Sequence, residues 1–373
     1  MYDIDLKKFW ENDNEAHKDN CFNPDAKQVA LGIRMSEECI YAELGEEGDP
    51  WGKNKREKIL ELNKRYNDKS EKIVGKRLLR ETILTKDESY PEIKRIGEIF
   101  GGTYKYIPNG GEWLSSDVRT PKELEKLLDR VDKLDLKDFI YPSNWEQEKK
   151  RIQDKYTIKP SVLGGVRGPV TLAMSIYGEE NLIFLYFDAK ELFERFSHTI
   201  KNVIIKMKEI SHEEAGYTKD NAPHGFGFAD DNCSLLNGEM YEIFGYPVLR
   251  DVFNKFSPNE GDNRFQHSDS EMEHLLSILS KVNLTGCNFG PTLKVDTIRK
   301  HMPNTRIDGQ LAPFTFMNNN EEKIIAEIKR DCELIKNTGT RGLNISTAGS
   351  INNGSLLTSL RAVMYAIEKY GQY

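Results

Sequence analysis

The chain has 373 residues, of which 38% are hydrophobic and 30% are charged, and this is enough to bury a core in one large domain or two ordinary ones. The formal net charge is −7 and no basic block occurs, which argues against nucleic acid as a partner. No run of about eighteen apolar residues and no apolar signal segment at the start is found, which excludes a membrane span and predicts a cytoplasmic protein.

The first part of the chain, residues 1–95, is charged and mainly helical in character. We predict that it is an N-terminal helical extension packed on a catalytic domain of residues 96–373. Residues 53–85 alternate charged residues with leucine, a pattern typical of solvated helix faces. Residues 34–43 mix polar and apolar side chains and can begin a core strand.

A hairpin and a capped helix follow. Residues 101–120 carry alternating aromatic side chains around Asn109, Gly110 and Gly111, which indicates a β-hairpin. A helix is predicted to begin at Pro121, with Thr120 as its N-cap.

From residue 160 onwards, strand and helix patterns alternate at intervals of roughly 30–45 residues, which predicts a parallel sheet with helical crossovers. About six such units are visible, and their number favours a (β/α)8 barrel over an open sheet. No Gly-x-Gly-x-x-Gly motif follows a strand and no Gly-Lys-Ser/Thr loop occurs, which argues against nucleotide-binding folds. The expected strands are 161–166, 225–229, a short stretch ending at His267, 283–291, 305–311 and 342–349.

The strand ends collect polar side chains, and in a barrel the chemistry lies at the C-terminal ends of the strands. The run His267-Ser268-Asp269 is the most informative, because residues i and i+2 of an extended segment point to the same side. An imidazole and a carboxylate on one side suit a metal ion or a proton-transfer site. The other strand-end residues are Asp230, Asp231, Asn232, Cys287, Asn288, Phe289, Asp308, Gly309 and Gln310.

A zinc site needs three or four nitrogen, sulfur or oxygen ligands. His267, Asp269 and Cys287 would supply one of each, with Asp231 or Glu239 as further oxygen donors. Each residue also has a simpler interpretation. Cys287 fits a small buried residue, and Asp231 fits a cap on the following turn.

The later part of the sequence resembles the uroporphyrinogen decarboxylase superfamily, over about residues 95–373. The resemblance implies a distorted TIM barrel and one of two chemistries. Decarboxylases act on a porphyrinogen, whereas methyltransferases, often zinc-dependent, move methyl groups to or from a corrinoid protein. The motifs that carry the resemblance are Leu163–Ala173, Ala229–Leu236, the His267-Ser-Asp269 site, Ile307–Pro313 and Tyr365–Gly371.

The decarboxylase needs cationic side chains for many carboxylates, and only Arg34 and Arg167 lie near strand ends. The methyltransferase branch that acts on coenzyme M carries His-x-Cys where this chain has His267 and Asp269, and it carries a later Cys where residues 346–350 have none. A carboxylate ligand makes a harder Lewis acid than a thiolate. This difference favours cleavage of a methyl–oxygen bond over thiol methylation.

We therefore predict a corrinoid-dependent methyltransferase that demethylates a small methoxylated compound, with zinc as its metal. The corrinoid would be supplied by a partner protein, and a homodimer is compatible with the resemblance. The alternatives are a porphyrinogen decarboxylase and a non-catalytic corrinoid- or tetrapyrrole-binding protein. The predicted catalytic residues are His267, Asp231 and Asp230; the predicted substrate-binding residues are Arg34, Asn288, Phe289 and Gln310; and the predicted metal ligands are His267, Asp269 and Cys287.

Overall fold

The computed structural model describes residues 2–108, 110–349 and 354–373. The chain folds into two compact units. Met1–Ile83 with His267–Tyr373 makes the first unit, and Leu84–Gln266 makes the second. The boundary between the units falls inside strand β6 (Arg264–Ser268).

The first unit contains a parallel sheet. Its strands lie side by side in the order β1 (Ala30–Leu31), β9 (Leu343–Thr347), β8 (Arg306–Leu311) and β7 (Gly286–Phe289). All four residues of β7 are buried, as expected where helices cover a parallel sheet. Because the strands are parallel, the C-terminal ends of β7, β8 and β9 lie at one edge of this sheet.

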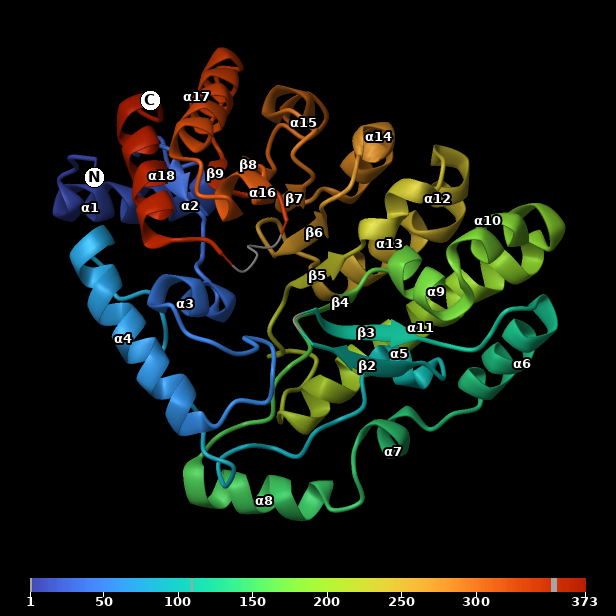
Figure 1. Ribbon diagram of the computed structural model, residues 1–373. Helices are drawn as coiled ribbons and strands as arrows, with labels where there is room; N and C mark the ends of the chain where they lie inside the picture. Colours follow the sequence, from blue (N-terminus) through green and yellow to red (C-terminus); the bar gives the residue numbers. More distant parts are fainter. Residues whose placement is uncertain (1, 109, 350–353) are drawn as a thin grey trace. The chain divides into compact units, whose positions relative to one another are not determined.

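The N-terminal and C-terminal parts of the chain meet in the first unit, where β1 pairs with β9 (Figure 1). Helices α17 and α18 pack against each other, and α17 buries Ile324, Ile328, Cys332 and Ile335 along one face. The helices of this unit are α1 (Leu6–Ala16), α2 (Lys18–Cys21), α3 (Glu37–Leu44), α4 (Arg56–Val74), α14 (Leu276–Leu279), α15 (Val295–His301), α16 (Pro313–Met317), α17 (Glu321–Asn337) and α18 (Leu357–Tyr370), with the 3-10 turns η2 (Glu273–Leu275) and η3 (Ser280–Val282).

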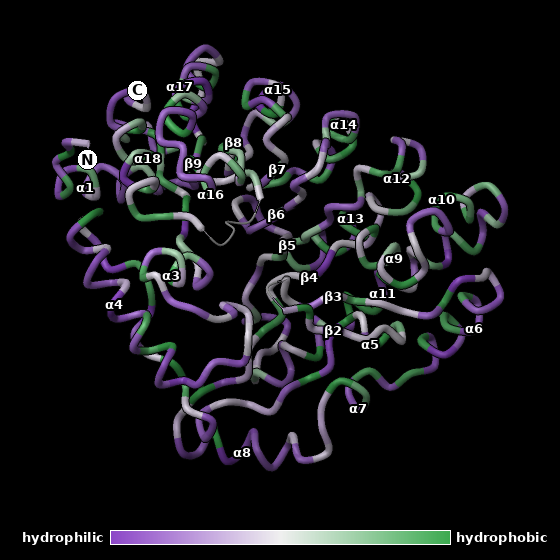
Figure 2. The backbone as a smooth tube through the Cα atoms, viewed as in Figure 1, coloured by the Kyte–Doolittle hydropathy of each residue, from purple (hydrophilic) through white to green (hydrophobic). Residues whose placement is uncertain are grey.

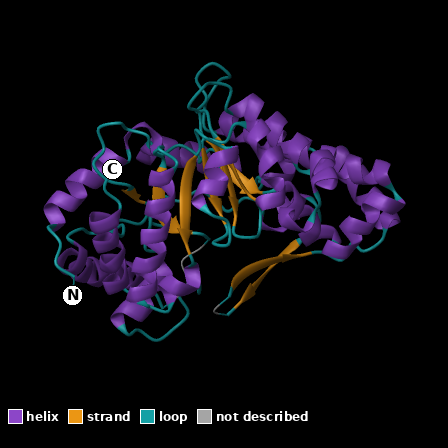
Figure 3. Ribbon diagram, turned by 90° about the horizontal axis from the view of Figure 1, so that it is seen from above, coloured by secondary structure: helices purple, strands orange, loops and turns teal. Residues whose placement is uncertain are grey.

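The second unit contains the parallel pair β4 (Gly165–Arg167) and β5 (Phe226–Ala229). A separate two-stranded hairpin is formed by β2 (Thr103–Ile107) and β3 (Gly111–Ser115), drawn in orange in Figure 3. The long helix α11 (Lys190–Glu214) is amphipathic, whereas α8 (Trp145–Tyr156) is largely hydrophilic (Figure 2). The remaining elements are α5 (Ile96–Ile99), α6 (Pro121–Asp132), α7 (Leu136–Ile140), α9 (Pro169–Tyr177), α10 (Glu179–Asp188), η1 (Asp231–Leu235), α12 (Gly238–Phe244) and α13 (Tyr246–Phe256).

The predicted hairpin and capped helix are confirmed. The hairpin pairs Lys105 with Trp113, although its turn residue Asn109 lies outside the described residues. The Thr120 hydroxyl accepts a hydrogen bond from the backbone N–H of Glu123, and the Glu123 carboxylate accepts one from the N–H of Thr120. This reciprocal capping box starts α6.

One predicted strand is wrong. Residues 34–43 do not begin a core strand, because most of this segment lies in helix α3, and the nearby strand is the two-residue β1 that precedes it. Its buried residues Cys39, Ile40 and Tyr41 are consecutive. They therefore lack the periodicity that would have indicated a helix.

The predicted fold class, a distorted (β/α)8 barrel with a mainly helical N-terminal extension, is confirmed. Seven strands, β1 and β4 to β9, alternate with helices along the described chain, one fewer than in a regular barrel. The pairs β1–β9, β9–β8, β8–β7 and β4–β5 are all parallel. The division into an extension of residues 1–95 and a catalytic domain of residues 96–373 stays a prediction.

Among the described helices, we find none with the length and apolar composition needed to cross a membrane.

Candidate active site

His267 and Asp269 lie where strand β6 ends in the first unit. In β6 the side chains of Gln266 and Ser268 are fully buried, whereas His267 is half-buried. Asp269 follows the strand and is exposed. A ring nitrogen of His267 and a carboxylate oxygen of Asp269 lie within 4.8 Å of each other. The i, i+2 spacing thus brings the two groups close enough to contact one small ligand.

Asn288, at the end of β7, fixes the orientation of the His267 ring. The Asn288 side-chain NH2 donates to the backbone carbonyls of Asp308 and Thr347, the second at 2.9 Å. Its Oδ1 therefore faces His267 Nδ1, at 2.7 Å. Because an amide oxygen only accepts hydrogen bonds, Nδ1 must carry the hydrogen. Nε2 then carries the lone pair that can bind a metal or accept a proton.

Two glycines leave room for Asp269. A Cβ atom on Gly290 would meet the Asp269 carbonyl oxygen at 2.6 Å. One on Gly349 would meet the Asp269 Cβ at 3.1 Å, and Gly349 has a φ of 120°. A residue other than glycine would strain the backbone at position 349 and crowd the carboxylate.

Asp308 lies within β8, and both of its carboxylate oxygens accept hydrogen bonds. Arg306 holds it in a two-point ion pair, from Nε to Oδ1 at 2.7 Å and from Nη2 to Oδ2 at 2.8 Å. Asn344, opposite on β9, donates to Oδ1 at 2.8 Å. Paired in this way, Asp308 is a structural carboxylate beneath Asn288 and not a site for substrate.

Three other predicted residues of the first unit are fully buried: Cys287, Phe289 and Gln310. Burial raises the pKa of the Cys287 thiol far above its usual range, and the nearby Asp308 adds to this effect. A thiol that keeps its proton is a poor metal ligand. Gln310 donates through its side-chain NH2 to the carbonyls of Gly290 and Leu293, at 2.8 and 2.7 Å. These contacts favour structural roles for all three.

Asp230, in the second unit, fixes the start of helix α9. Its Oδ1 accepts a hydrogen bond from the backbone N–H of Thr171 at 2.7 Å. The N-cap residue itself is Gly168, and a Cβ there would lie 2.1 Å from the Asp230 Cβ. Asp230 thus supplies the cap that a glycine cannot. Burial raises the pKa of its carboxyl to about 7 in spite of the hydrogen bonds from Thr171.

The remaining predicted residues are Asp231 and Arg34. Asp231 begins η1 directly after Asp230 and is half-buried in the second unit. Arg34 is exposed in the first unit, three residues after β1. Their predicted roles, like those of the other site residues, stay predictions.

Sequence reasoning missed the supporting residues Arg306, Asn344 and Gly349. Arg306 and Asn344 belong to strands that were predicted, but the pattern of a strand does not show which residue on the next strand it faces. The pairing of Asp308 with Asn344 follows from the β8–β9 register, which only the structure gives. Gly349 is the last residue of a predicted strand, and a glycine at that place was the one available signal of a crowded backbone.

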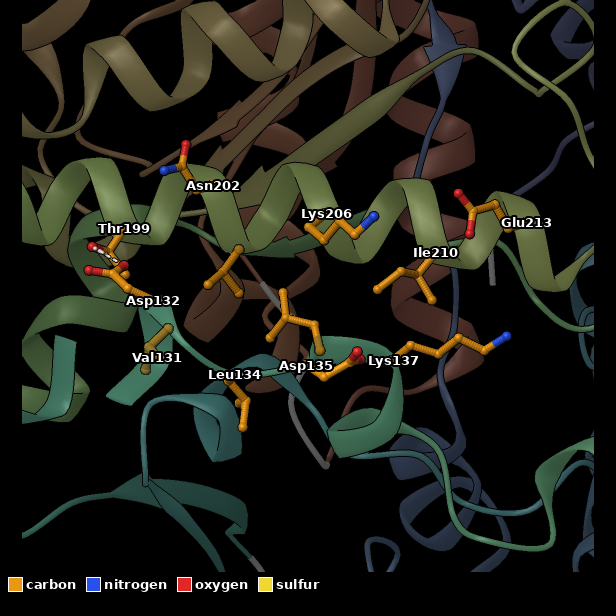
Figure 4. A pocket seen from close by; sticks show the side chains of 12 residues that line it. Val131, Asp132, Leu134, Asp135, Lys137, Thr199, Asn202, Lys206, Ile210 and Glu213 are labelled. Carbon is orange, nitrogen blue, oxygen red and sulfur yellow. Dashed lines mark hydrogen bonds between the residues drawn. The ribbon is translucent and has the colours of Figure 1, made fainter. Parts of the chain in front are cut away.

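A cavity of about 440 Å³ lies in the second unit between α11 and the segment that joins α6 to α7 (Figure 4). Charged side chains of both signs, among them Asp135, Lys206 and Glu213, stand beside apolar ones such as Val131 and Ile210. No predicted site residue lines this cavity, so it is distinct from the strand-end residues described above.

Of two solved structures compared with this chain, one has a similar fold and the other a lower similarity. A methyltransferase from Methanosarcina mazei is 15% identical, with 99% of each chain covered and a TM-score of 0.59. A B12-independent methionine synthase from Shewanella sp. W3-18-1, in complex with selenomethionine, is 11% identical over 85% of this chain and 88% of that one, with a TM-score of 0.36. No curated protein matches the sequence.

The family assignment rests on the sequence. A model of the family described as uroporphyrinogen decarboxylase (URO-D) matches residues 90–370, well over half of the chain. The match includes β6, β7, β8 and β9 and therefore the residues His267, Asp269 and Asn288. The resemblance carried by the sequence motifs is thus confirmed, and the chain belongs to the uroporphyrinogen decarboxylase family.

Proposed function

We propose that this protein is a methyltransferase that moves a methyl group from the oxygen of a small methoxylated substrate to the cobalt of a corrinoid carried by a separate protein. One observation carries the proposal: Asn288 accepts a hydrogen bond from His267 Nδ1 and so fixes the tautomer of the ring, and a carboxylate oxygen of Asp269 lies within 4.8 Å of the ring. The fold likeness to a methyltransferase supports the general class.

The donor set fits zinc. A neutral imidazole whose second nitrogen donates to an oxygen, together with a carboxylate, is a common part of zinc sites. We propose His267 Nε2 and the Asp269 carboxylate as two of its ligands. When bound, zinc would supply Lewis acidity that stabilises the negative charge on the oxygen losing its methyl group. Cys287, whose thiol keeps its proton, is not included.

The chain's own residues act by positioning. Asn288 holds the imidazole in one tautomer, and Gly290 and Gly349 give the Asp269 backbone and side chain their space. Arg34 is exposed, and we propose that it binds a polar group of the substrate. Without a metal, His267 would first take up a proton at Nε2, and this imidazolium would then donate that proton to the leaving oxygen.

The first experiment measures metal content and needs no substrate. Purified protein is dialysed against a low concentration of zinc, and bound zinc is quantified with a chromophoric chelator. We expect about one zinc per chain and a loss of affinity of at least about tenfold in His267→Ala and in Asp269→Asn. His301→Ala, at the end of α15, is the matched control and should keep the zinc.

The second experiment measures methyl transfer. Protein, a reduced corrinoid protein and a panel of methoxylated compounds are mixed, and methyl–cobalt formation is followed by absorbance. Failure across the panel, with removal of carboxyl groups from an added porphyrinogen, would assign the decarboxylase activity for which the family is named. Binding of a tetrapyrrole without any product, unchanged in His267→Ala, would assign a non-catalytic binding protein.

A further inference from the structure

The turn after helix α1 has an unusual backbone. Asp19, Asn20 and Cys21 have φ angles of 51°, 54° and 68°, so α2 is not a regular right-handed helix. Each left-handed residue other than glycine costs about 1–2 kcal/mol. A turn with three of them in succession needs strong external contacts.

Those contacts come from the N-terminal ends of the sheet strands. The Asn20 side chain donates to the carbonyl of Thr285 at 2.7 Å and accepts from Arg306 at 2.5 Å. The carbonyl of Cys21 accepts from the N–H of Gly342 at 2.9 Å. The left-handed turn is therefore fixed in place just before β7, β8 and β9.

The turn brings Cys21 back beside His17. Cys21 Sγ lies 3.9 Å from His17 Nδ1. His17 Nε2 lies 3.2 Å from the carbonyl oxygen of Leu31 and 3.5 Å from Asp13 Oδ2. A carbonyl can only accept, so Nε2 carries a hydrogen and Nδ1 faces the thiol. A thiol, an imidazole and an orienting carboxylate form the arrangement that activates a nucleophile.

The surroundings of Cys21 are positively charged. The hydrogen bond with Asp13, and then the one with Cys21, raise the pKa of His17 to about 10, although burial opposes this. The pKa of Arg306 is raised too, first by its hydrogen bond with Asp308 and to a smaller extent by the charge of Cys21.

The other four cysteines of the chain, Cys39, Cys233, Cys287 and Cys332, are 0% exposed, whereas Cys21 is 5% exposed. Burial raises the pKa of Cys39 to about 11 and that of Cys332 to about 12. Cys39 and Cys332 therefore keep their protons at neutral pH, and all four fully buried cysteines serve as internal controls for the reactivity of Cys21.

We propose that Cys21 is an oxidation site, at which a small hydroperoxide converts the thiol to a sulfenic acid with His17 as the proton carrier. In the reactive form the one proton that the pair shares lies on His17 Nδ1, so the sulfur of Cys21 is a thiolate, and this sulfur attacks one peroxide oxygen. A sulfur–oxygen bond forms as the oxygen–oxygen bond breaks. The sulfur is oxidised by two electrons and the peroxide is reduced by two. The departing oxygen takes the proton from Nδ1, and with hydrogen peroxide the product is water. The small exposed fraction of Cys21 restricts the site to small oxidants.

The test compares the five cysteines within one folded sample. The full chain is treated with a few equivalents of hydrogen peroxide, trapped with a sulfenic-acid-specific dione, digested, and analysed by mass spectrometry. We expect Cys21 to be labelled at least about tenfold faster than any of the other four. In urea, which exposes all five thiols, the difference should disappear. Labelling of Cys21 no faster than that of Cys39 or Cys332 in the folded protein would overturn the proposal.

Variants test the role of His17. His17→Gln should slow the labelling of Cys21 by about tenfold or more, whereas His198→Gln, on the exposed face of α11, should not change it. Far-ultraviolet circular dichroism establishes that both variants are folded. A folded His17→Gln variant with unchanged labelling would also overturn the proposal. If His17→Gln does not fold, the comparison of cysteines in the natural sequence still decides the matter.

Discussion

His267 at the end of β6 and His17 after α1 are both held by a hydrogen bond at one ring nitrogen, but their partners differ. His267 donates to the neutral amide of Asn288, whereas His17 lies against the buried carboxylate of Asp13. A neutral partner fixes the tautomer without adding charge, which suits a ligand with an available lone pair. An anionic carboxylate stabilises a second proton on the imidazole ring, and the ring is then an imidazolium beside the thiol. The charge of the hydrogen-bond partner thus decides whether a histidine suits the role of a neutral ligand or that of an imidazolium.

The largest effect is expected from removing the neutral partner. Asn288→Ala leaves the buried carbonyls of Asp308 and Thr347 without a donor and frees the His267 ring to rotate. We expect the free energy of unfolding to fall by about 2–4 kcal/mol and the proposed zinc affinity to fall by about 10- to 100-fold. Urea denaturation and chelator competition measure the two quantities.

The matched control for this prediction is Asn202→Ala, because Asn202 is exposed on α11. It should leave stability and zinc affinity within experimental error. A folded Asn288→Ala variant with the zinc affinity of the natural sequence would show that the ring of His267 does not need its partner.

The next largest effect concerns the space around Asp269. Gly349→Ala places a Cβ 3.1 Å from the Asp269 Cβ at a φ of 120°, so we expect a loss of about 1–3 kcal/mol in unfolding free energy together with weaker zinc binding. Gly164→Ala, where a Cβ meets nothing within 4 Å, is the control and should change neither. Equal effects of the two substitutions would show that the crowding at Asp269 is unimportant.

The sequence was sufficient for the strands after residue 160 and for the His267–Asp269 pair, because both depend on local periodicity. The spacing of i and i+2 on β6 needs no knowledge of the rest of the fold. The partner of His267 could not be predicted in the same way. Asn288 was predicted to bind substrate, and in the structure its two polar side-chain atoms make hydrogen bonds with His267, Asp308 and Thr347.

The arrangement of side chains around His17 could not be predicted from the sequence either. Asp13, His17 and Cys21 recur every four residues, a helical spacing, but the sequence gives no sign that the chain turns left-handed between His17 and Cys21. Three successive residues with positive φ occur there only because Thr285, Arg306 and Gly342, far along the chain, bind the turn. Local propensity alone would favour a right-handed helix.

A smaller effect is expected when the anionic partner is neutralised. Asp13→Asn keeps an oxygen for the N–H of Leu31 but removes the charge beside His17. We expect slower labelling of Cys21, by about three- to tenfold, and a loss of about 1 kcal/mol in unfolding free energy. Glu15→Gln on the same helix, which breaks only an exposed ion pair with Lys18, should change neither. Unchanged labelling in Asp13→Asn would show that the activation of Cys21 does not depend on the charge of Asp13.

The smallest effect is a pH dependence that belongs to His17. Its pKa is about 10 in the folded chain against 6.5 for an ordinary histidine, so the folded state binds the proton more tightly. The stability that follows is fully present below about pH 6.5 and is lost as the pH rises to about 10. Since the side chain is 41% exposed, solvent screening reduces this contribution to about 1 kcal/mol.

The measurement is the difference in unfolding free energy between the natural sequence and His17→Gln, taken at several pH values from about 6 to about 10. Subtraction removes the titration of the other groups, provided that the variant is folded. We expect the difference to be largest at the acid end and to shrink steadily towards the alkaline end. A difference that stays constant would show that His17 stabilises the turn by packing and neutral hydrogen bonds, and that its partner Asp13 does not make it an imidazolium. In that case His17 and His267 would differ in their positions in the fold but not in the charge of their rings.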